Sequence, residues 1–164
     1  MKKLILFALL APFALHSKNN LVGYKASKTD FTFELPSEDV YFSVKEDFQK
    51  YYSHTELFYN EDEDFVLGIA ELIPSEYLSK IDYDEFLKEY ASDYDYENSY
   101  PFYEVEIKPG VNSKYYIAYD ADMESMEIFG IVHDRVSRKI YEIELSLYTI
   151  DVYTGAMIIY SLEL

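Results

Sequence analysis

An acidic stretch in the middle of the chain carries oxygen ligands at the spacing of a calcium loop. The residues at positions 1, 3, 5 and 12 of that spacing are Asp93, Asp95, Glu97 and Glu104. Carboxylates at alternate positions can converge on one ion, and a final Glu can bind through both oxygens. Asn98 stands where the loop has Gly, and Pro101 interrupts it. We expect no cofactor, with a variant calcium site at these residues as the alternative, because so acidic a chain also produces chance matches.

The same stretch is rich in tyrosine. Rings and acids alternate in what we call the Tyr–acid segment: Tyr90, Asp93, Tyr94, Asp95, Tyr96, Glu97, Tyr100 and Tyr103. Tyrosine rings and carboxylates together can hold a basic protein through ring packing, cation–π contact and charge. The segment predicts a partner-binding surface, and the alternative is a polar loop after a helix.

Residues for covalent catalysis are scarce. The chain has no cysteine, no Gly-x-Ser-x-Gly motif and no glycine-rich phosphate loop. Two histidines lie beyond the leader, His54 and His133, and neither has a local catalytic signature. With 31 acidic residues, some carboxylate pair will always lie at a glycosidase distance. We expect a protein that is not an enzyme.

The charge balance restricts the partners. The chain has 31 acidic and 14 basic residues and a net charge of −17. Such a field repels nucleic acids and anionic lipids and attracts cations and basic proteins. We therefore expect a basic protein partner and no nucleic acid, with solubility alone as the simpler explanation of the charge.

The N-terminus has the pattern of a secretory leader. Lys2 and Lys3 precede an apolar run over residues 4–15, and polar residues follow. The pattern predicts a signal peptide over residues 1–17, an acidic domain over 18–164, and an exported protein in the periplasm or medium. Because Leu15 is large for the position before the cut, an uncleaved anchor is the alternative. A lipid anchor on cysteine is excluded.

The remaining chain reads as short strands joined by turns. Residues 31–35 and 40–44 alternate apolar and polar around a turn at Pro36, which predicts a hairpin. Further strands are predicted over residues 55–59, 65–73, 102–107, 114–119, 126–133 and 139–147, the last four forming an antiparallel meander.

Two segments have helical spacing. Asp82 and Glu85 form a capping box before apolar residues on one face, which predicts a helix over 81–92. Residues 149–164 fit a terminal helix, with a strand over 157–164 as the alternative. The order predicts an α+β domain in which one antiparallel sheet (hairpin, helix, C-terminal meander) has helices packed on it.

This order resembles the PsbP-like fold, which includes an extrinsic photosystem protein, a Ran-binding nuclear import factor and bacterial envelope proteins. The resemblance rests on apolar spacing in residues 31–36 (FTFELP), 114–117 (KYYI), 140–143 (IYEI) and 158–162 (IIYSL). It implies a binding or assembly-assisting domain without a shared catalytic centre, and it assigns no functional residue.

Two functions are therefore expected. The first is an exported, non-enzymatic binding protein whose acidic, Tyr-rich surface recognises a basic protein, as an inhibitor, an immunity protein or an assembly chaperone would. The second is a structural envelope domain that binds calcium or a small ligand.

Overall fold

The described part of the chain is mostly β-structure. The computed structural model describes residues 21–36, 38–45, 52–62, 64–72, 100–108, 110–120 and 124–164, with the backbone alone for 100–108, 119 and 120. These ranges contain nine strands and one helix: β1 (Val22–Lys25), β2 (Thr32–Leu35), β3 (Val40–Lys45), β4 (Tyr52–Asn60), β5 (Phe65–Leu72), β6 (Tyr100–Lys108), β7 (Val111–Asp120), β8 (Ser125–Asp134), β9 (Lys139–Leu147) and α3 (Val152–Ser161).

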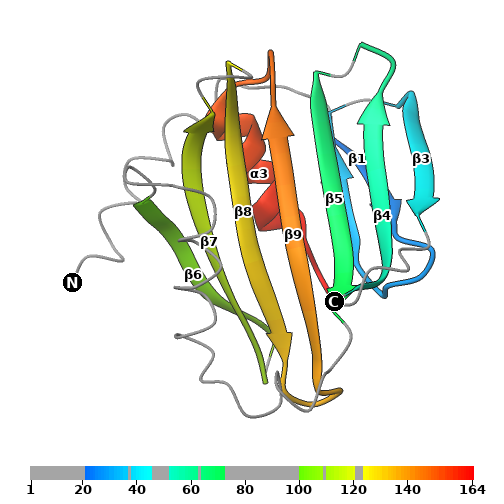
Figure 1. Ribbon diagram of the computed structural model, residues 1–164, viewed down its shortest axis with the longest axis vertical. Helices are drawn as coiled ribbons and strands as arrows, with labels where there is room; N and C mark the ends of the chain where they lie inside the picture. Colours follow the sequence, from blue (N-terminus) through cyan, green and yellow to red (C-terminus); the bar gives the residue numbers. More distant parts are fainter. Residues whose placement is uncertain are drawn as a thin grey trace.

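Seven strands form one large antiparallel sheet, and the other two form a small one. The order in the large sheet is β3-β4-β5-β9-β8-β7-β6, and β1 pairs with β2 separately (Figure 1). The strands β6 to β9 pair as the predicted meander. Its last strand, β9, lies beside β5, from Phe65 opposite Leu147 to Leu72 opposite Ile140. This pairing joins the two halves of the chain at the centre of the sheet.

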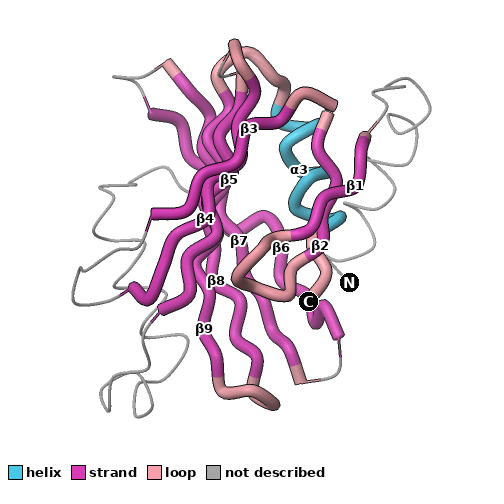
Figure 2. Tube along the Cα trace, turned by 90° about the vertical axis from the view of Figure 1, so that its right-hand side faces the viewer, coloured by secondary structure: helices cyan, strands magenta, loops and turns pink. Residues whose placement is uncertain are grey.

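The main core lies on one face of the large sheet, which we call the inner face. Figure 2 shows α3 and the small sheet on this same side. Because strand side chains alternate between faces, the inner face receives every second residue of β5, β8 and β9. Its fully buried side chains include Phe65, Leu67, Ile69, Ile128, Ile143 and Leu145, and the small sheet adds Phe31 and Leu35.

The terminal helix is confirmed, and the alternative strand over 157–164 does not form. Asp151 caps α3 by accepting hydrogen bonds from the backbone N–H groups of Tyr153 and Thr154. Gly155 lets the helix approach the sheet closely, since a Cβ there would lie 2.4 Å from Leu147 Cδ1. After the helix, Glu163 exchanges two backbone hydrogen bonds with Thr32 of the small sheet.

The predicted fold class is wrong. In place of one sheet covered by helices, the described residues form two antiparallel sheets with a single helix at the C-terminus. The predicted hairpin between residues 31–35 and 40–44 is also wrong, because β2 pairs with β1 while β3 pairs with β4. The physical reason is burial: Phe31, Phe33 and Leu35 cover the inner face as a second layer. The helix predicted over residues 81–92 lies outside the described residues.

No helix among the described residues is both long enough and apolar enough to cross a bilayer.

Candidate functional site

Three carboxylates lie on the face of the large sheet that points away from α3, which we call the outer face. Glu142 and Glu144 are alternate residues of β9, so both side chains leave the sheet on this face. On β8, Phe129 lies opposite Glu144, and Glu127 is two positions before it, which places its carboxylate on the same face. We call Glu127, Glu142 and Glu144 the outer carboxylate group.

Glu144 has the most perturbed titration of the group. Burial raises the pKa of Glu144 most, the negative charges of Glu127 and Glu142 raise it further, and the result is about 7. Among the described residues, no hydrogen-bond donor and no cation is paired with its carboxylate. Both causes act in the same direction because the charged form lacks water and lies beside like charges. The site therefore disfavours a negative charge at Glu144.

Glu142 is held more firmly. It is 9% exposed, and the Tyr52 hydroxyl donates a hydrogen bond to its Oε2 atom at 3.0 Å. Tyr52 begins β4, and a register irregularity between Tyr52 and His54 brings this ring to the outer face. A bulge of this kind re-aims a side chain within a sheet. The hydrogen bond fixes one carboxylate beside the unpaired Glu144.

Aromatic and aliphatic side chains surround the group. The rings of Phe129 and Tyr116 stack with centroids 5.4 Å apart, and Phe129 is fully buried. A small second core on the outer face contains Leu72 and Ile131, with Tyr52, Tyr116 and Ile140 packed against it. Phe129 is opposite Glu144 in the register, so this apolar surface adjoins the carboxylates.

Small residues lie on the other side of the carboxylates. Gly68 of β5 is opposite Glu144, and Ala70 is opposite Glu142. A Cβ placed on Gly68 would lie 3.5 Å from Leu57 Cδ2 and 3.9 Å from Glu144 Cβ, which is ordinary contact. The backbone of β5 thus adjoins Glu144 without a bulky side chain beside it.

The arrangement suits an organic cation. A lysine or arginine side chain carries one positive charge on an apolar stem, so it can pack on the rings while its head meets a carboxylate. No three His, Asp or Glu side chains within the described ranges are grouped so that they could hold a metal ion.

Comparisons with known proteins show only distant similarity. No protein-family model matches the chain, and no curated protein matches it. Among solved structures, a mutant of the protein Mog1 is similar at 11% sequence identity and a TM-score of 0.49, and the match covers 88% of this chain and 95% of the Mog1 chain. Neither a family nor a function follows from that similarity.

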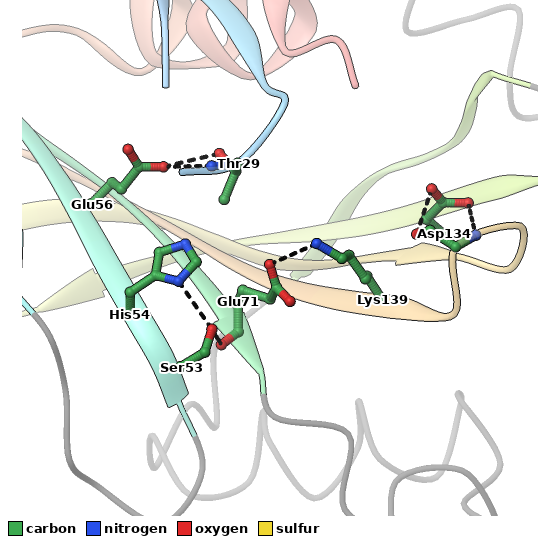
Figure 3. Close-up of polar contacts among 8 residues, drawn as sticks. Thr29, Ser53, His54, Glu56, Glu71, Asp134 and Lys139 are labelled. Atoms are coloured by element: carbon green, nitrogen blue, oxygen red, sulfur yellow. Dashed lines mark hydrogen bonds and ion pairs between the residues drawn. The ribbon is translucent and has the colours of Figure 1, made fainter. Parts of the chain in front are cut away.

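Glu56 is a second notable carboxylate, but its partners are all within the chain. It is fully buried on β4 and accepts five hydrogen bonds from the loop between β1 and β2. The donors are the backbone and hydroxyls of Ser27 and Thr29 and the Lys28 backbone, and Figure 3 shows the bonds from Thr29. Burial alone would raise the pKa of Glu56, but these hydrogen bonds outweigh it and lower the pKa. Its oxygens are used to join the two sheets.

Serine, histidine and glutamate lie close together on the inner face, yet they do not form a triad. The Ser53 hydroxyl lies 3.0 Å from Nδ1 of the adjacent His54 and 3.2 Å from the backbone oxygen of Glu71. The Glu71 carboxylate is paired with Lys139 at 3.1 Å instead of orienting the imidazole (Figure 3). The proton-relay order that a nucleophilic serine needs is therefore missing.

His133 is the penultimate residue of β8, next to a turn that Asp134 organises. Asp134 accepts hydrogen bonds from the backbone N–H groups of Val136 and Ser137 and from the Ser137 hydroxyl. Burial lowers the pKa of His133, the charge of Arg135 lowers it further, and Asp134 opposes both. The carboxylate beside this histidine thus stabilises a hairpin turn.

The residues predicted from sequence as a site are mostly outside the described ranges. Six residues of the Tyr–acid segment, three of which also belong to the calcium loop, lie outside the described ranges: Tyr90, Asp93, Tyr94, Asp95, Tyr96 and Glu97. The backbones of Tyr100, Tyr103 and Glu104 belong to β6, where Glu104 is opposite Lys114 of β7. The partner-binding and calcium assignments therefore stay predictions.

The outer carboxylate group was not identified from the sequence. Glu142 and Glu144 alternate with Tyr141, Ile143 and Leu145, a pattern that indicates only a polar outer face. Nothing in that pattern shows that aromatic side chains from β7 and β8 bury this face in part.

Proposed function

We propose that this protein is an exported, non-enzymatic binding protein that receives a lysine or arginine side chain of a basic protein partner at the outer carboxylate group. The observation that carries the proposal is the carboxylate of Glu144, which is largely withdrawn from water, lies beside two like charges and has a pKa of about 7.

A cation at this position counteracts both effects that raise the pKa of Glu144, namely burial and the neighbouring negative charges. A positive charge near Glu144 stabilises its ionised form, and it also offsets the charges of Glu127 and Glu142. Hydrogen bonds between charged groups in a low-dielectric setting are stronger than those at an open surface. A bound cation therefore stabilises the ionised carboxylate of Glu144, which the unbound protein disfavours.

The surroundings favour a side chain over a small hydrated ion. The stacked rings of Tyr116 and Phe129 offer a surface for the methylene stem of lysine or the plane of arginine. The net charge of −17 adds long-range attraction for a basic protein. Association should accordingly slow as the salt concentration rises.

The test uses NMR of the carboxyl carbon of Glu144 and a capped tetralysine peptide as the probe. We expect the peptide to lower the pKa of Glu144 by about one unit, because a bound cation favours the ionised form. The substitution Glu144→Gln should weaken peptide binding by roughly tenfold. Glu163→Gln is the matched control, since Glu163 is an exposed acid beyond α3.

Two results would contradict the proposal. One is a pKa of Glu144 that does not change at saturating peptide. The other is equal loss of affinity in Glu144→Gln and Glu163→Gln, which would show that net charge alone binds the peptide. Both variants keep the side-chain size, so their melting temperatures in the absence of peptide show whether folding is intact.

A further inference from the structure

The strand β3 ends the large sheet, and its outer edge has no hydrogen-bond partner in the part of the chain that the structure describes. Among the described residues, β3 pairs with β4 alone. None of the six residues from Val40 to Lys45 makes a further hydrogen bond. Figure 1 shows β3 at the end of the sheet that lies opposite β6. With respect to the described residues, one edge of the sheet is thus open along a whole strand.

An open edge presents backbone groups in a row. In an antiparallel pair, alternate residues direct their N–H and C=O groups away from the partner strand, so about half of the β3 residues offer them outward. Proteins usually protect such edges with proline, a bulge or charged side chains. The pairing of β3 with β4 has no register shift, β3 contains no proline, and its single charged residue is Lys45 at the end. The edge therefore lacks most of these protections.

Large aromatic side chains flank this edge on both faces of the sheet. Tyr41 is 50% exposed and stacks on Tyr59, with ring centroids 5.9 Å apart. Phe42 is 46% exposed and lies against Phe58, at 5.1 Å between centroids. Tyr41 and Phe42 are adjacent in the strand, so they lie on opposite faces. An added strand would cover both rings.

One end of the edge is strongly acidic. The register places Val40 opposite Asn60, so the segment before β3 and the turn after β4 lie at the same end. The exposed acids there are Glu38, Asp39, Glu61 and Asp62. A strand that docks on β3 thus meets four negative charges at the end where β3 begins.

We propose that β3 is a docking edge for an extended basic segment of a partner protein, which adds to the sheet as an antiparallel strand. Its backbone pairs with the outward groups of β3, its apolar side chains cover Tyr41 and Phe42, and Lys or Arg residues at its C-terminal end face the four acids. Edge addition of this kind takes its affinity from the backbone and its specificity from alternate side chains.

A second copy of the chain fits this edge less well. Each copy has a net charge of −17, so two chains repel each other. If two copies paired through β3, each strand would offer one cation, Lys45, to the four acids of the other copy. A basic partner complements the same edge without that repulsion. This docking edge and the outer carboxylate group use different residues, so either proposal can fail alone.

The test uses a capped peptide of alternating threonine and valine that ends in three lysines, with the full chain. We expect binding to slow hydrogen exchange of outward amides in β3, because these groups become paired. The double substitution of Glu38→Gln and Asp39→Gln should weaken binding roughly fivefold at low salt. Phe42→Lys should block docking, because an added charge protects an edge.

The controls separate the edge from general charge attraction. Glu163→Gln should bind the peptide as the unaltered chain does, since Glu163 belongs to neither proposed site. A peptide that ends in three glutamates should not bind. Hydrogen exchange in β3 that does not change when the lysine peptide is bound would overturn the proposal. So would sedimentation that shows a dimer, if Phe42→Lys dissociates this dimer and the peptide does not bind to the unaltered chain. If Phe42→Lys unfolds, the double variant at Glu38 and Asp39 still tests the proposal, because these residues lie outside the strand.

Discussion

The carboxylate of Glu56 accepts hydrogen bonds from both the backbone N–H and the hydroxyl of Thr29, at 3.0 and 3.1 Å, across 27 positions of sequence. Glu56 belongs to β4 of the large sheet, and Thr29 lies in the loop between the two strands of the small sheet. Together with the bonds from Ser27 and Lys28, this contact ties the second layer to the first. One ionised side chain therefore anchors the loop of the small sheet to the large sheet.

Replacing that side chain should loosen the small sheet. We expect Glu56→Gln to lower the free energy of unfolding by about 3 kcal/mol, because an amide group would face backbone donors that now meet a carboxylate. Urea unfolding at pH 7 measures the loss, with the exposed Glu163→Gln as the control. Equal stability of the two variants would contradict the role of Glu56.

The same carboxylate sets an acid limit on stability. The pKa of Glu56 is lower in the folded protein than its ordinary value of 4.5. Its stabilising contribution is therefore complete above about pH 4.5 and is lost as the pH falls through the lower folded value. Urea titrations between pH 3 and 6 should show a steeper acid loss in the unaltered chain than in Glu56→Gln.

Glu144 should give the opposite dependence. Its pKa is raised from 4.5 to about 7, so the folded state holds a proton that the unfolded chain has released between these values. The stability attributable to Glu144 then falls as the pH rises through this window, by about 3 kcal/mol at most. We expect Glu144→Gln to be more stable than the unaltered chain at pH 8 and similar to it at pH 4. Parallel pH profiles for the two proteins would exclude the raised pKa.

Two glycines of the large sheet should respond differently to an added methyl group. A Cβ on Gly130 would lie 2.4 Å from the Tyr115 ring and 2.5 Å from the Lys114 backbone oxygen, whereas one on Gly68 makes only ordinary contacts. Gly130→Ala should therefore cost about 2 kcal/mol or more, and Gly68→Ala should be neutral or slightly stabilising. Urea unfolding compares them directly, and a similar cost at both positions would contradict the packing argument.

The calcium hypothesis has its own test. If residues 93–104 bind the ion, the melting temperature should rise with added calcium and fall with chelator, since a ligand of the folded state stabilises it. Replacing Asp93 and Glu104 by alanine should abolish the shift. A melting temperature that does not change with calcium would exclude the calcium site. The proposed binding of a lysine or arginine side chain at the outer carboxylate group would be unaffected.

Strand positions could be predicted well because alternation is a local property. All eight predicted strands match observed ones within a few residues, and β1 alone was missed, since it is four residues long. The meander from β6 to β9 followed from short turns between consecutive strands. The false hairpin between residues 31–35 and 40–44 shows the limit, because a turn at Pro36 also suits a chain that passes from one layer to another.

The candidate sites illustrate the same division. The alternation in residues 141–145 by itself determined that Glu142 and Glu144 lie on one face of the strand and that Tyr141 and Ile143 lie on the other. Local sequence likewise determined the helical spacing of residues 149–164. These properties depend on neighbours within a few residues, which the sequence states directly.

Tertiary structure alone decided what those faces meet. It placed β5 beside β9, set the stacked rings of Tyr116 and Phe129 next to the carboxylates, and left β3 at an open edge. The raised pKa of Glu144 arises from that burial and from the charges of Glu127 and Glu142. Desolvation and charge repulsion depend on distances between segments that are far apart in the chain, and only the packed fold sets those distances.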